Sequence, residues 1–447
     1  MDYHGYDGWC VIAFIGNGCK EKATVYIEKH RRLGGIFLKT KVLMVGRNRA
    51  FVTALEKNLP NTELYVLEEP DLHERHQKEP FTSLILKETR TGTYQQSDGL
   101  VKDAKIWNDE IGFDAVVPGV EYAVMGAGRV AQELGLPYLG KKAVSSLTNK
   151  LRLRELCRDN NIPHPRFTRV QSLQDVHRFF EGDKIVIKPA NRQASAGVIK
   201  IEKEDDIEAA YEEMIRTDEG HKIAKREMKW EFMAEEYLDG IEVSVETLVQ
   251  NGQVLFHNVT EKTTTEGRYF VELGHVLPAS LPSEQIDQLL FNQKMLVFAL
   301  QAENGFLHAE WKFTPEGPKL IECAGRAAGD FIMDLIEIAY GFNIYSTLLQ
   351  ILSNQKVTLP QDNIQGACIR FFEPSPGVLK EIHGIELLEQ GDEHLDSYLL
   401  TAKPGDQIYP INSSWARVGH VIVKGKDSYD AKLRAEDYIR RLEFIVE

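Results

Sequence analysis

The sequence has few cysteines and no long apolar run. Five cysteines occur in 447 residues and no two form a C-x-x-C pair; they are Cys10, Cys19, Cys157, Cys323 and Cys368. Neither a disulfide framework nor a zinc site is indicated, and the pattern favours a reducing cytoplasm. No apolar run approaches the length of a membrane span. The segment 9–16, WCVIAFIG, is too short to span and follows no basic stretch, so we interpret it as a strand rather than a signal peptide.

Basic residues are also fewer than acidic ones. The chain has 53 lysines and arginines against 67 aspartates and glutamates, which gives a net charge of −14. A wide basic surface for nucleic acid is therefore not expected, although a local basic pocket for phosphates remains allowed. The remaining composition, 43% hydrophobic and 27% charged, is ordinary for a globular chain whose length suits two or three domains.

No complete nucleotide-binding fingerprint occurs. The G-x-G at Gly126 and Gly128 lies in or beside an expected helix and lacks a third glycine, so we interpret it as packing. Lys188 ends a β-like run and is followed by the small residues 194–197, which do not form a Walker A loop. A lysine beside such a loop can hold phosphates, because its charge and the loop's backbone N–H groups both approach closely. An exposed lysine beside a plain turn is an equal alternative.

Helix and strand patterns indicate a mixed α/β chain. The first part, 41–48, predicts a buried strand, and 115–140 predicts strand, loop, helix and a further short strand. The later elements expected are a helix at 148–160, a strand at 184–190, a solvated helix and loop at 203–231, and two strands around an Asp239-Gly240 turn within 232–249. We divide the chain into an extension of unknown role at 1–39, an α/β domain at 40–147, a central domain at 148–360 and a C-terminal αβ segment at 361–447.

The segment 308–326, HAEWKFTPEGPKLIECAGR, predicts a hairpin that carries a carboxylate on each strand. A hairpin centred on Glu316 pairs Phe313 with Lys319, Trp311 with Ile321, and Glu310 with Glu322. Like charges directly opposite each other are destabilising. The arrangement becomes favourable if Mg²⁺ lies between the carboxylates, because this ion takes carboxylate oxygens together with substrate phosphates. The alternative is a solvated sheet face with unrelated acids.

Two further residues carry weak hints of an anion site. Lys150 lies near the start of a helix, where a cation opposes the positive end of the helix dipole unless an anion is bound there. Glu242 opens a strand just after a glycine turn, where its carboxylate could accept two ribose hydroxyls or face water.

Taken in order, these pieces resemble the ATP-grasp superfamily. Within it the chain looks most like the bacterial L-amino-acid ligases that join two free amino acids into a dipeptide. The resemblance covers roughly residues 40–400. It rests on four segments in this order: VIKPANRQASAG, MAEEYLDGIEVSVE, GHVLPA and HAEWKF…IECAGR. It implies an α/β ATP-grasp fold in which the central domain carries a mobile lid at about 185–240.

The resemblance also implies roles for particular residues. Phosphate binding falls on Lys150, Lys188, Ser195 and Gly197; adenine contacts on Glu235, Glu236, Tyr237 and Leu238; ribose on Glu242; and Mg²⁺ or Mn²⁺ on Glu310 and Glu322. Catalysis falls on Lys188 and Arg326, and amino-acid binding on Glu121, His275 and Arg326.

One position departs from the superfamily pattern. Most ATP-grasp enzymes carry a metal-binding asparagine two residues after the second acid, where this chain has Ala324. The dipeptide ligases are similar in lacking it, and they carry an arginine at the position of Arg326. An extended chain puts Arg326 on the same face as Glu322, and an arginine can grip a carboxylate or phosphate through two hydrogen bonds.

The implied activity is an ATP-dependent ligation of two amino acids through an acyl phosphate, with no membrane or nucleic-acid partner and with a homodimer left open. The first alternative is an ATP-grasp ligase for another acid or amine acceptor. The second is a nucleotide-binding module without catalysis, which the retention of both lysines, both metal acids and Arg326 argues against.

Overall fold

The N-terminal part of the protein is a parallel α/β unit. The computed structural model describes residues 39–78, 81–265 and 269–447. The predicted extension 1–39, with Cys10, Cys19 and the strand expected at 9–16, lies outside these ranges except for its last residue. The strands of the first sheet, in spatial order, are β3 (Leu86–Thr91), β2 (Glu63–Glu68), β1 (Lys41–Val45) and β4 (Ala115–Pro118). The helices around it are α2 (Arg49–Asn58), α3 (Pro70–Gln77), α4 (Gly99–Ile111) and α5 (Val124–Leu134).

Helices cover both faces of this sheet, which explains why β1 has no polar alternation. Val42, Leu43, Met44 and Val45 are all fully buried, and the strand predicted at 41–48 is confirmed. The further short strand predicted at the end of 115–140 is wrong. Tyr138 and Leu139 each accept one backbone hydrogen bond, from Asn304 and Glu303, but no strand ladder forms there.

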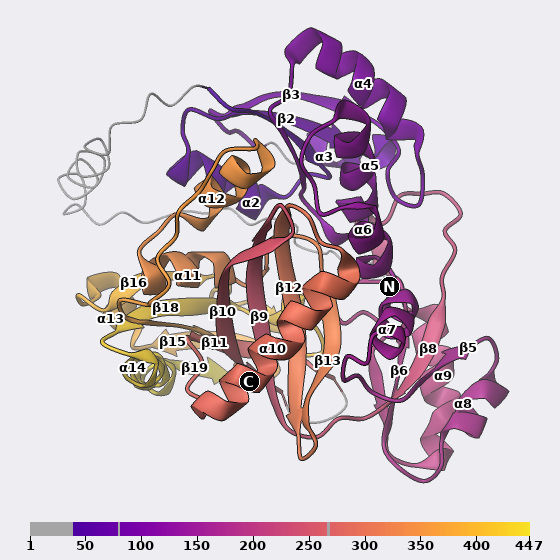
Figure 1. Cartoon of the computed structure of the whole chain (residues 1–447). Helices are drawn as coiled ribbons and strands as arrows, with labels where there is room; N and C mark the ends of the chain where they lie inside the picture. Colours follow the sequence, from indigo (N-terminus) through magenta and orange to yellow (C-terminus); the bar gives the residue numbers. More distant parts are fainter. Residues whose placement is uncertain (1–38, 79–80, 266–268) are drawn as a thin grey trace.

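A large antiparallel sheet forms the centre of the molecule (Figure 1). Its strands, in spatial order, are β13 (Gly317–Ala324), β12 (Gly305–Thr314), β9 (Ile241–Gln250), β10 (Gln253–Thr264), β11 (Glu272–Leu277), β14 (Gly366–Phe371), β18 (Gly419–Gly425) and β16 (Leu395–Leu400). The last three come from the C-terminal part of the chain, so that part extends the central sheet.

Helices cover both faces of the β9–β12 region. Leu289, Leu296 and Leu300 of α10 (Ser283–Leu300) pack with odd-numbered residues of β9 and β12, such as Val243 and Leu307. The opposite face packs with α11 (Ile332–Tyr340), α12 (Ile344–Leu352) and the N-terminal sheet. Because side chains alternate along a strand, the even-numbered residues of β9, which include Glu242 and Glu246, point toward this second face.

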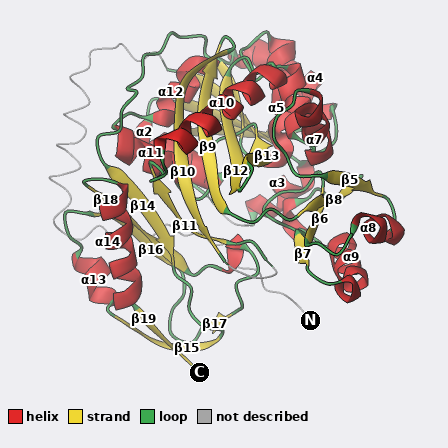
Figure 2. Ribbon diagram, turned by 60° about the horizontal axis from the view of Figure 1, so that its bottom comes forward, coloured by secondary structure: helices red, strands yellow, loops and turns green. Residues whose placement is uncertain are grey.

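A smaller sheet stands beside the large one (Figure 2). Its strands, in spatial order, are β5 (Phe167–Val170), β8 (Phe232–Glu236), β6 (Ile185–Pro189) and β7 (Ile199–Ile201), covered by α8 (Leu173–Phe179) and α9 (Ile207–Arg216). The strands expected at 184–190 and within 232–249 are confirmed. However, β8 and β9 belong to different sheets, so the Asp239-Gly240 turn joins two layers. Strands β6, β7 and β8 and helix α9 fall within the predicted lid at about 185–240, whereas β5 and α8 precede it; the mobility of the lid stays a prediction.

The remaining elements lie mostly at the C-terminal end. They are the strands β15 (Gly377–His383), β17 (Gln407–Ile408) and β19 (Glu443–Val446), and the helices α6 (Lys141–Leu147), α7 (Lys150–Asp159), α13 (Ile385–Gln390) and α14 (Ser428–Arg441). Short 3₁₀ turns occur at Glu121–Ala123, Glu204–Asp206, Gly220–Lys222 and Ser414–Ala416.

In the described part of the chain, no helix is by itself long and apolar enough to cross a bilayer. Only α11 and α12 taken together reach that length and composition, and they are bent by 104° relative to each other.

Candidate active site

A cavity of about 810 Å³, open to solvent, lies between the smaller sheet and the central sheet. Its walls come from the start of α7, from β6 and β8, and from β9, β12 and β13. The predicted residues that line it are Lys150, Lys188, Ser195, Glu235, Glu236, Tyr237, Leu238, Glu242, Glu310 and Glu322. Gly197 follows the lining residue Ala196 and has a φ of +74°, which glycine adopts more easily than other residues. The structure thus gathers the residues assigned to nucleotide and metal around one space.

Lys150 lies at the first position of α7 because Asn149 caps this helix, accepting hydrogen bonds from the N–H groups of Leu151 and Arg152. The Nζ of Lys150 lies 2.9 Å from Oε1 of Glu322 and donates to the carbonyl of Arg192 at 2.8 Å. Burial acts to lower the pKa of Lys150, but the negative charge of Glu322 outweighs it and the pKa is raised. The lysine therefore stays charged, as binding a phosphate requires.

Lys188 and Glu235 form a buried ion pair with Arg154. The Nζ of Lys188 lies 2.5 Å from one oxygen of Glu235, and Nε of Arg154 lies 2.6 Å from the other. Burial and the charge of Arg154 lower the pKa of Lys188 despite the Glu235 carboxylate. Burial raises the pKa of Glu235, but Arg154 and Lys188 prevail and lower it. The side chain of Glu235 thus orients Lys188, which leaves Glu236, Tyr237 and Leu238 as the stronger candidates for adenine contacts.

The carboxylates of the hairpin lie opposite each other, as predicted, but for a reason that the sequence did not reveal. Glu310 pairs with Glu322. The predicted pairs of Phe313 with Lys319 and Trp311 with Ile321 are wrong by one residue, because the turn is Pro315-Glu316 and Phe313 faces Pro318. A bulge at Ile321 restores the register beyond it, and the carbonyl of this extra residue accepts a hydrogen bond from Arg154.

Only one oxygen of each hairpin carboxylate is occupied by a neighbouring cation. Oε1 of Glu322 meets Lys150, and Oε1 of Glu310 meets Nζ of Lys262 at 2.8 Å. Within the described ranges no hydrogen bond ends on Oε2 of either residue, and both residues line the cavity. The described residues contain no cluster of three metal-binding side chains. Two carboxylates with a free oxygen each fit a Mg²⁺ ion whose other ligands are phosphates and water.

The central sheet presents a row of alternating charges beside these carboxylates. Lys312 lies opposite Glu242 on the neighbouring strand, and Lys262 lies opposite His275. Nζ of Lys262 is 2.8 Å from Glu242 and 3.5 Å from Glu272. Burial acts to lower the pKa of Lys262, but the surrounding carboxylates raise it well above its usual value.

Lys262 was missed in the sequence analysis, although a signal was present. Asn258, Thr260 and Lys262 form an alternating polar series in a strand, which indicates a polar sheet face. Arg154 was missed as well. It follows Lys150 by four residues, so both lie on one face of α7.

A second buried pair lies further along the same strands. Nδ1 of His308 is 2.9 Å from Glu246, and Nε2 of His308 is 3.5 Å from Glu310. Burial acts to lower the pKa of His308, but its hydrogen bonds to Glu246 and Glu310 raise it to about 9. Burial raises the pKa of Glu246, and His308 reverses this shift, so the pKa is lowered.

The residues predicted to bind amino acids fall into two pairs. Nε of Arg326 donates to Glu121 at 2.6 Å, which joins the loop after β13 to the 3₁₀ turn after β4. Nε2 of His275 lies 3.3 Å from Asp330, which also accepts two hydrogen bonds from Arg417 at 2.7 and 2.8 Å. The sequence analysis missed Asp330 and Arg417, because nothing in the chain near Arg417 indicates which loop it meets.

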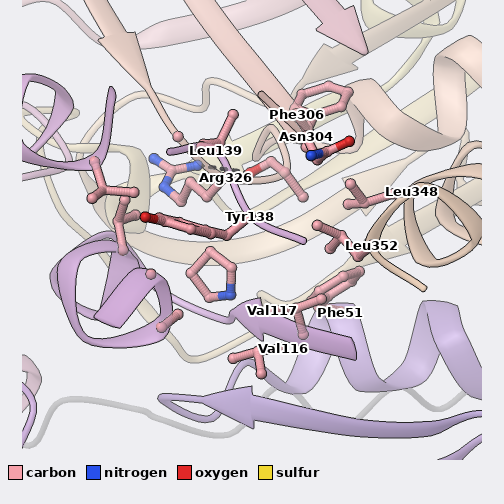
Figure 3. A pocket seen from close by; sticks show the side chains of 18 residues that line it. Phe51, Val116, Val117, Tyr138, Leu139, Asn304, Phe306, Arg326, Leu348 and Leu352 are labelled. Carbon is pink, nitrogen blue, oxygen red and sulfur yellow. Dashed lines mark hydrogen bonds between the residues drawn. The ribbon is translucent and has the colours of Figure 1, made fainter. Parts of the chain in front are cut away.

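Arg326 also borders a second cavity of about 480 Å³, between the N-terminal unit and the central sheet (Figure 3). Its lining is largely apolar and includes Phe51, Val117, Phe306 and Leu352. Arg326 is the one residue of this lining that the sequence analysis assigned to the site.

Family comparisons agree with this geometry. The model of the ATP-grasp domain matches residues 182–334, which include Lys188, both hairpin carboxylates and Arg326. The chain contains an ATP-grasp domain. The model of L-amino acid ligase C-terminal domain 2 matches residues 370–447, which include Arg417. The predicted resemblance to the ATP-grasp superfamily and to L-amino-acid ligases and the predicted α/β fold class are confirmed, while the boundaries at 147/148 and 360/361 stay predictions.

Curated relatives at modest identity are ligases. The chain is 26% identical over 260 residues to an alanine–anticapsin ligase of Bacillus subtilis (strain 168), a match that covers 54% of each chain. It is 25% identical over 284 residues to an L-arginine-specific L-amino acid ligase of Bacillus subtilis, covering 62% of this chain and 67% of that one. The first match thus spans about half the length of that relative.

Solved structures show the same fold. An L-amino acid ligase from Bacillus licheniformis superimposes with a TM-score of 0.74 at 18% identity, covering 92% of this chain and 99% of that one. A phosphoribosylglycinamide synthetase from Anaerococcus prevotii gives 0.65 at 17% identity, covering 92% of this chain and all of that one.

Proposed function

We propose that this ATP-grasp protein joins two L-amino acids into a dipeptide, with ATP converted to ADP and phosphate. The observation that carries the proposal is the meeting of Lys150, Lys188, Glu310 and Glu322 around one cavity, with Arg326 four residues beyond the second carboxylate. The match of residues 370–447 to a domain named for L-amino acid ligases supports amino acids as the substrates.

The first step is phosphoryl transfer. A carboxylate oxygen of one amino acid attacks the γ-phosphorus of ATP, the bond to the β-phosphate oxygen breaks, and an acyl phosphate and ADP result. Lys150 and Lys188 bind the phosphate oxygens, whose charge spreads during the transfer. Glu310 and Glu322 would hold Mg²⁺, which neutralises part of that charge.

The second step forms the peptide bond. The amine of the second amino acid attacks the acyl carbon, the bond from that carbon to the phosphate oxygen breaks, and the proton lost by the amine leaves with the phosphate as HPO₄²⁻. In this proposal Arg326 binds the negative charge on this centre through two hydrogen bonds. Its present partner, Glu121, is free to bind a substrate ammonium once Arg326 turns to the phosphate. His275 pairs with Lys262 on the neighbouring strand, and in this proposal it contacts an amino-acid substrate. The lid would exclude water, which otherwise hydrolyses the acyl phosphate.

The experiment is phosphate release from ATP with Mg²⁺, measured across pairs of free L-amino acids and with each amino acid alone, with products identified by mass spectrometry. The proposal predicts release with certain pairs and a product whose mass is the sum of the two minus water. Release with another acid or amine, such as a ribosylamine with glycine, would support the other-acceptor alternative. ATP binding with no release under any of these conditions would support the non-catalytic alternative.

A further inference from the structure

A buried carboxylate and a buried imidazole lie two residues along strands β9 and β12 from Glu310 and its partner Ser244. Glu246 of β9 and His308 of β12 are opposite each other in the register, and their side chains meet at 2.9 Å. Glu246 is completely buried and His308 is 9% exposed. Neither residue lines the nucleotide cavity, and the proposed reaction uses neither of them directly.

Glu246 is held from several sides. It accepts hydrogen bonds from Ser244 at 2.6 Å, Asn258 at 2.9 Å and Thr260 at 2.7 Å. The hydroxyl of Tyr340 in turn donates to Asn258 at 3.0 Å. A buried ionised pair is costly to keep unless its hydrogen bonds are satisfied, and replacing such a pair by apolar residues is often neutral or stabilising. Stabilisation of the fold alone is therefore a weak explanation for the presence of the Glu246–His308 pair.

The pair reaches the metal site through a single oxygen. Nε2 of His308 lies 3.5 Å from Oε1 of Glu310, and Nζ of Lys262 lies 2.8 Å from the same atom. Two nitrogen atoms on one oxygen fix the rotation of the carboxylate. The other oxygen, Oε2, is then left for the cavity.

We infer that Glu246 and His308 are positioning residues for a divalent cation at Glu310: Glu246 fixes the ring of His308, and His308 fixes Glu310 so that Oε2 faces the ion. The inference rests on the proposed function, in which Glu310 is a metal ligand. In metal sites generally, a residue that hydrogen-bonds to a metal ligand sets the orientation of that ligand, and the inference gives this role to Glu246 and His308.

The test is Mn²⁺ binding in the presence of ADP, followed by electron paramagnetic resonance on the full chain. The variant Glu246→Gln with His308→Gln replaces both members of the pair together and can retain a hydrogen bond between the two side chains, so neither is left buried without its partner. We expect Mn²⁺ affinity to fall roughly 10–100-fold, the usual effect of losing such a partner. ADP affinity measured without metal should be unchanged.

Tyr340→Phe is the matched control, because it removes a buried hydrogen bond from the same network without touching His308 or Glu310. It should lower stability and leave Mn²⁺ affinity as in the wild type. Wild-type Mn²⁺ affinity in the double variant, or an equal loss in Tyr340→Phe, would overturn the inference while the proposed function stands. A wild-type protein that binds no Mn²⁺ with ADP would overturn both.

Discussion

The proposed nucleotide end and the proposed amino-acid end of the site are built differently. At the nucleotide end, most of the lining residues come from 182–334, on strands that are neighbours in space and close in sequence. At the amino-acid end, contacts join distant segments: Glu121 to Arg326, and His275 to Asp330 and Arg417. The contacts at the first end lie mostly within one domain, whereas those at the second end depend on how separate parts of the chain pack together. We therefore expect damage at the nucleotide end to stop all turnover, and damage at the amino-acid end to affect the amino-acid steps alone.

The largest effect should come from Glu322→Gln. It removes one negative charge where the charge of the phosphates and metal must be balanced, so phosphate release should be abolished with the fold intact. The measurement is steady-state phosphate release together with circular dichroism. Glu316→Gln, in the turn of the same hairpin and with a 70% exposed side chain, is the matched control and should behave as the wild type. Near-normal turnover by Glu322→Gln would remove this residue from the metal site.

Lys188→Met should come next. It removes the charge expected to meet the phosphates while roughly keeping the size of the side chain. ATP affinity should fall about tenfold or more, since a hydrogen bond to a charged group contributes about 1.5–3 kcal/mol, and acyl-phosphate formation should fail. Calorimetric titration with ATP checks the affinity, and Lys203→Met at an exposed position is the control. If the affinity and rate did not change, Lys188 would be only the buried partner of Glu235.

Arg326→Lys tests the amino-acid end. Lysine keeps the charge but loses the planar two-point contact. We expect ATP binding to persist and amino-acid-dependent phosphate release to fall on the order of 10²-fold, as when one oxyanion donor is removed. The measurement compares ATP affinity with release at saturating amino acids. An unchanged rate would make Arg326 a neighbour of the site only, and a parallel loss of ATP affinity would erase the contrast between the two ends.

The smallest expected effect is on stability and concerns His420, which packs against Phe331 and Phe371 beside Arg417. Burial, and secondarily the charge of Arg417, lowers its pKa to about 4. The unfolded chain, with an ordinary pKa of about 6.5, therefore binds more protons between these values. The free energy of unfolding should fall by up to about 3 kcal/mol from this group as the pH drops from 6.5 to 4. Denaturant unfolding should show a shallower pH slope in His420→Phe, which keeps a ring but cannot titrate; equal slopes would contradict the shift.

The same contrast explains what the sequence could predict. Strand β1 and the start of α7 follow from local patterns of burial and capping. The pairing of Glu310 with Glu322 was predicted correctly, but it is produced by a bulge and not by the predicted register. The bulge at Ile321 could not be predicted, because it depends on the turn length and on a hydrogen bond from Arg154 in another element. Likewise, the expected strand after α5 failed because Tyr138 and Leu139 meet only the backbone of residues 303–304.

The charged partners of the site were hardest to predict. The partners that were missed are Arg154, Lys262, Asp330 and Arg417, and all of them take part through ion pairs. Most of these pairs join residues at least 48 positions apart in the sequence, such as Lys262 with Glu310 and Arg417 with Asp330. Ion pairs of this kind leave no periodic signal in the chain.

The most direct test of the account is transfer of a labelled oxygen. An amino acid carrying ¹⁸O in its carboxylate is incubated with the protein, ATP, Mg²⁺ and a second amino acid that supports phosphate release. An acyl phosphate on the path requires that one labelled oxygen end in inorganic phosphate, since the carboxylate oxygen that attacked the γ-phosphorus leaves with it. The account predicts one ¹⁸O per phosphate released, with dipeptide in equal amount. Dipeptide accompanied by unlabelled phosphate would contradict it.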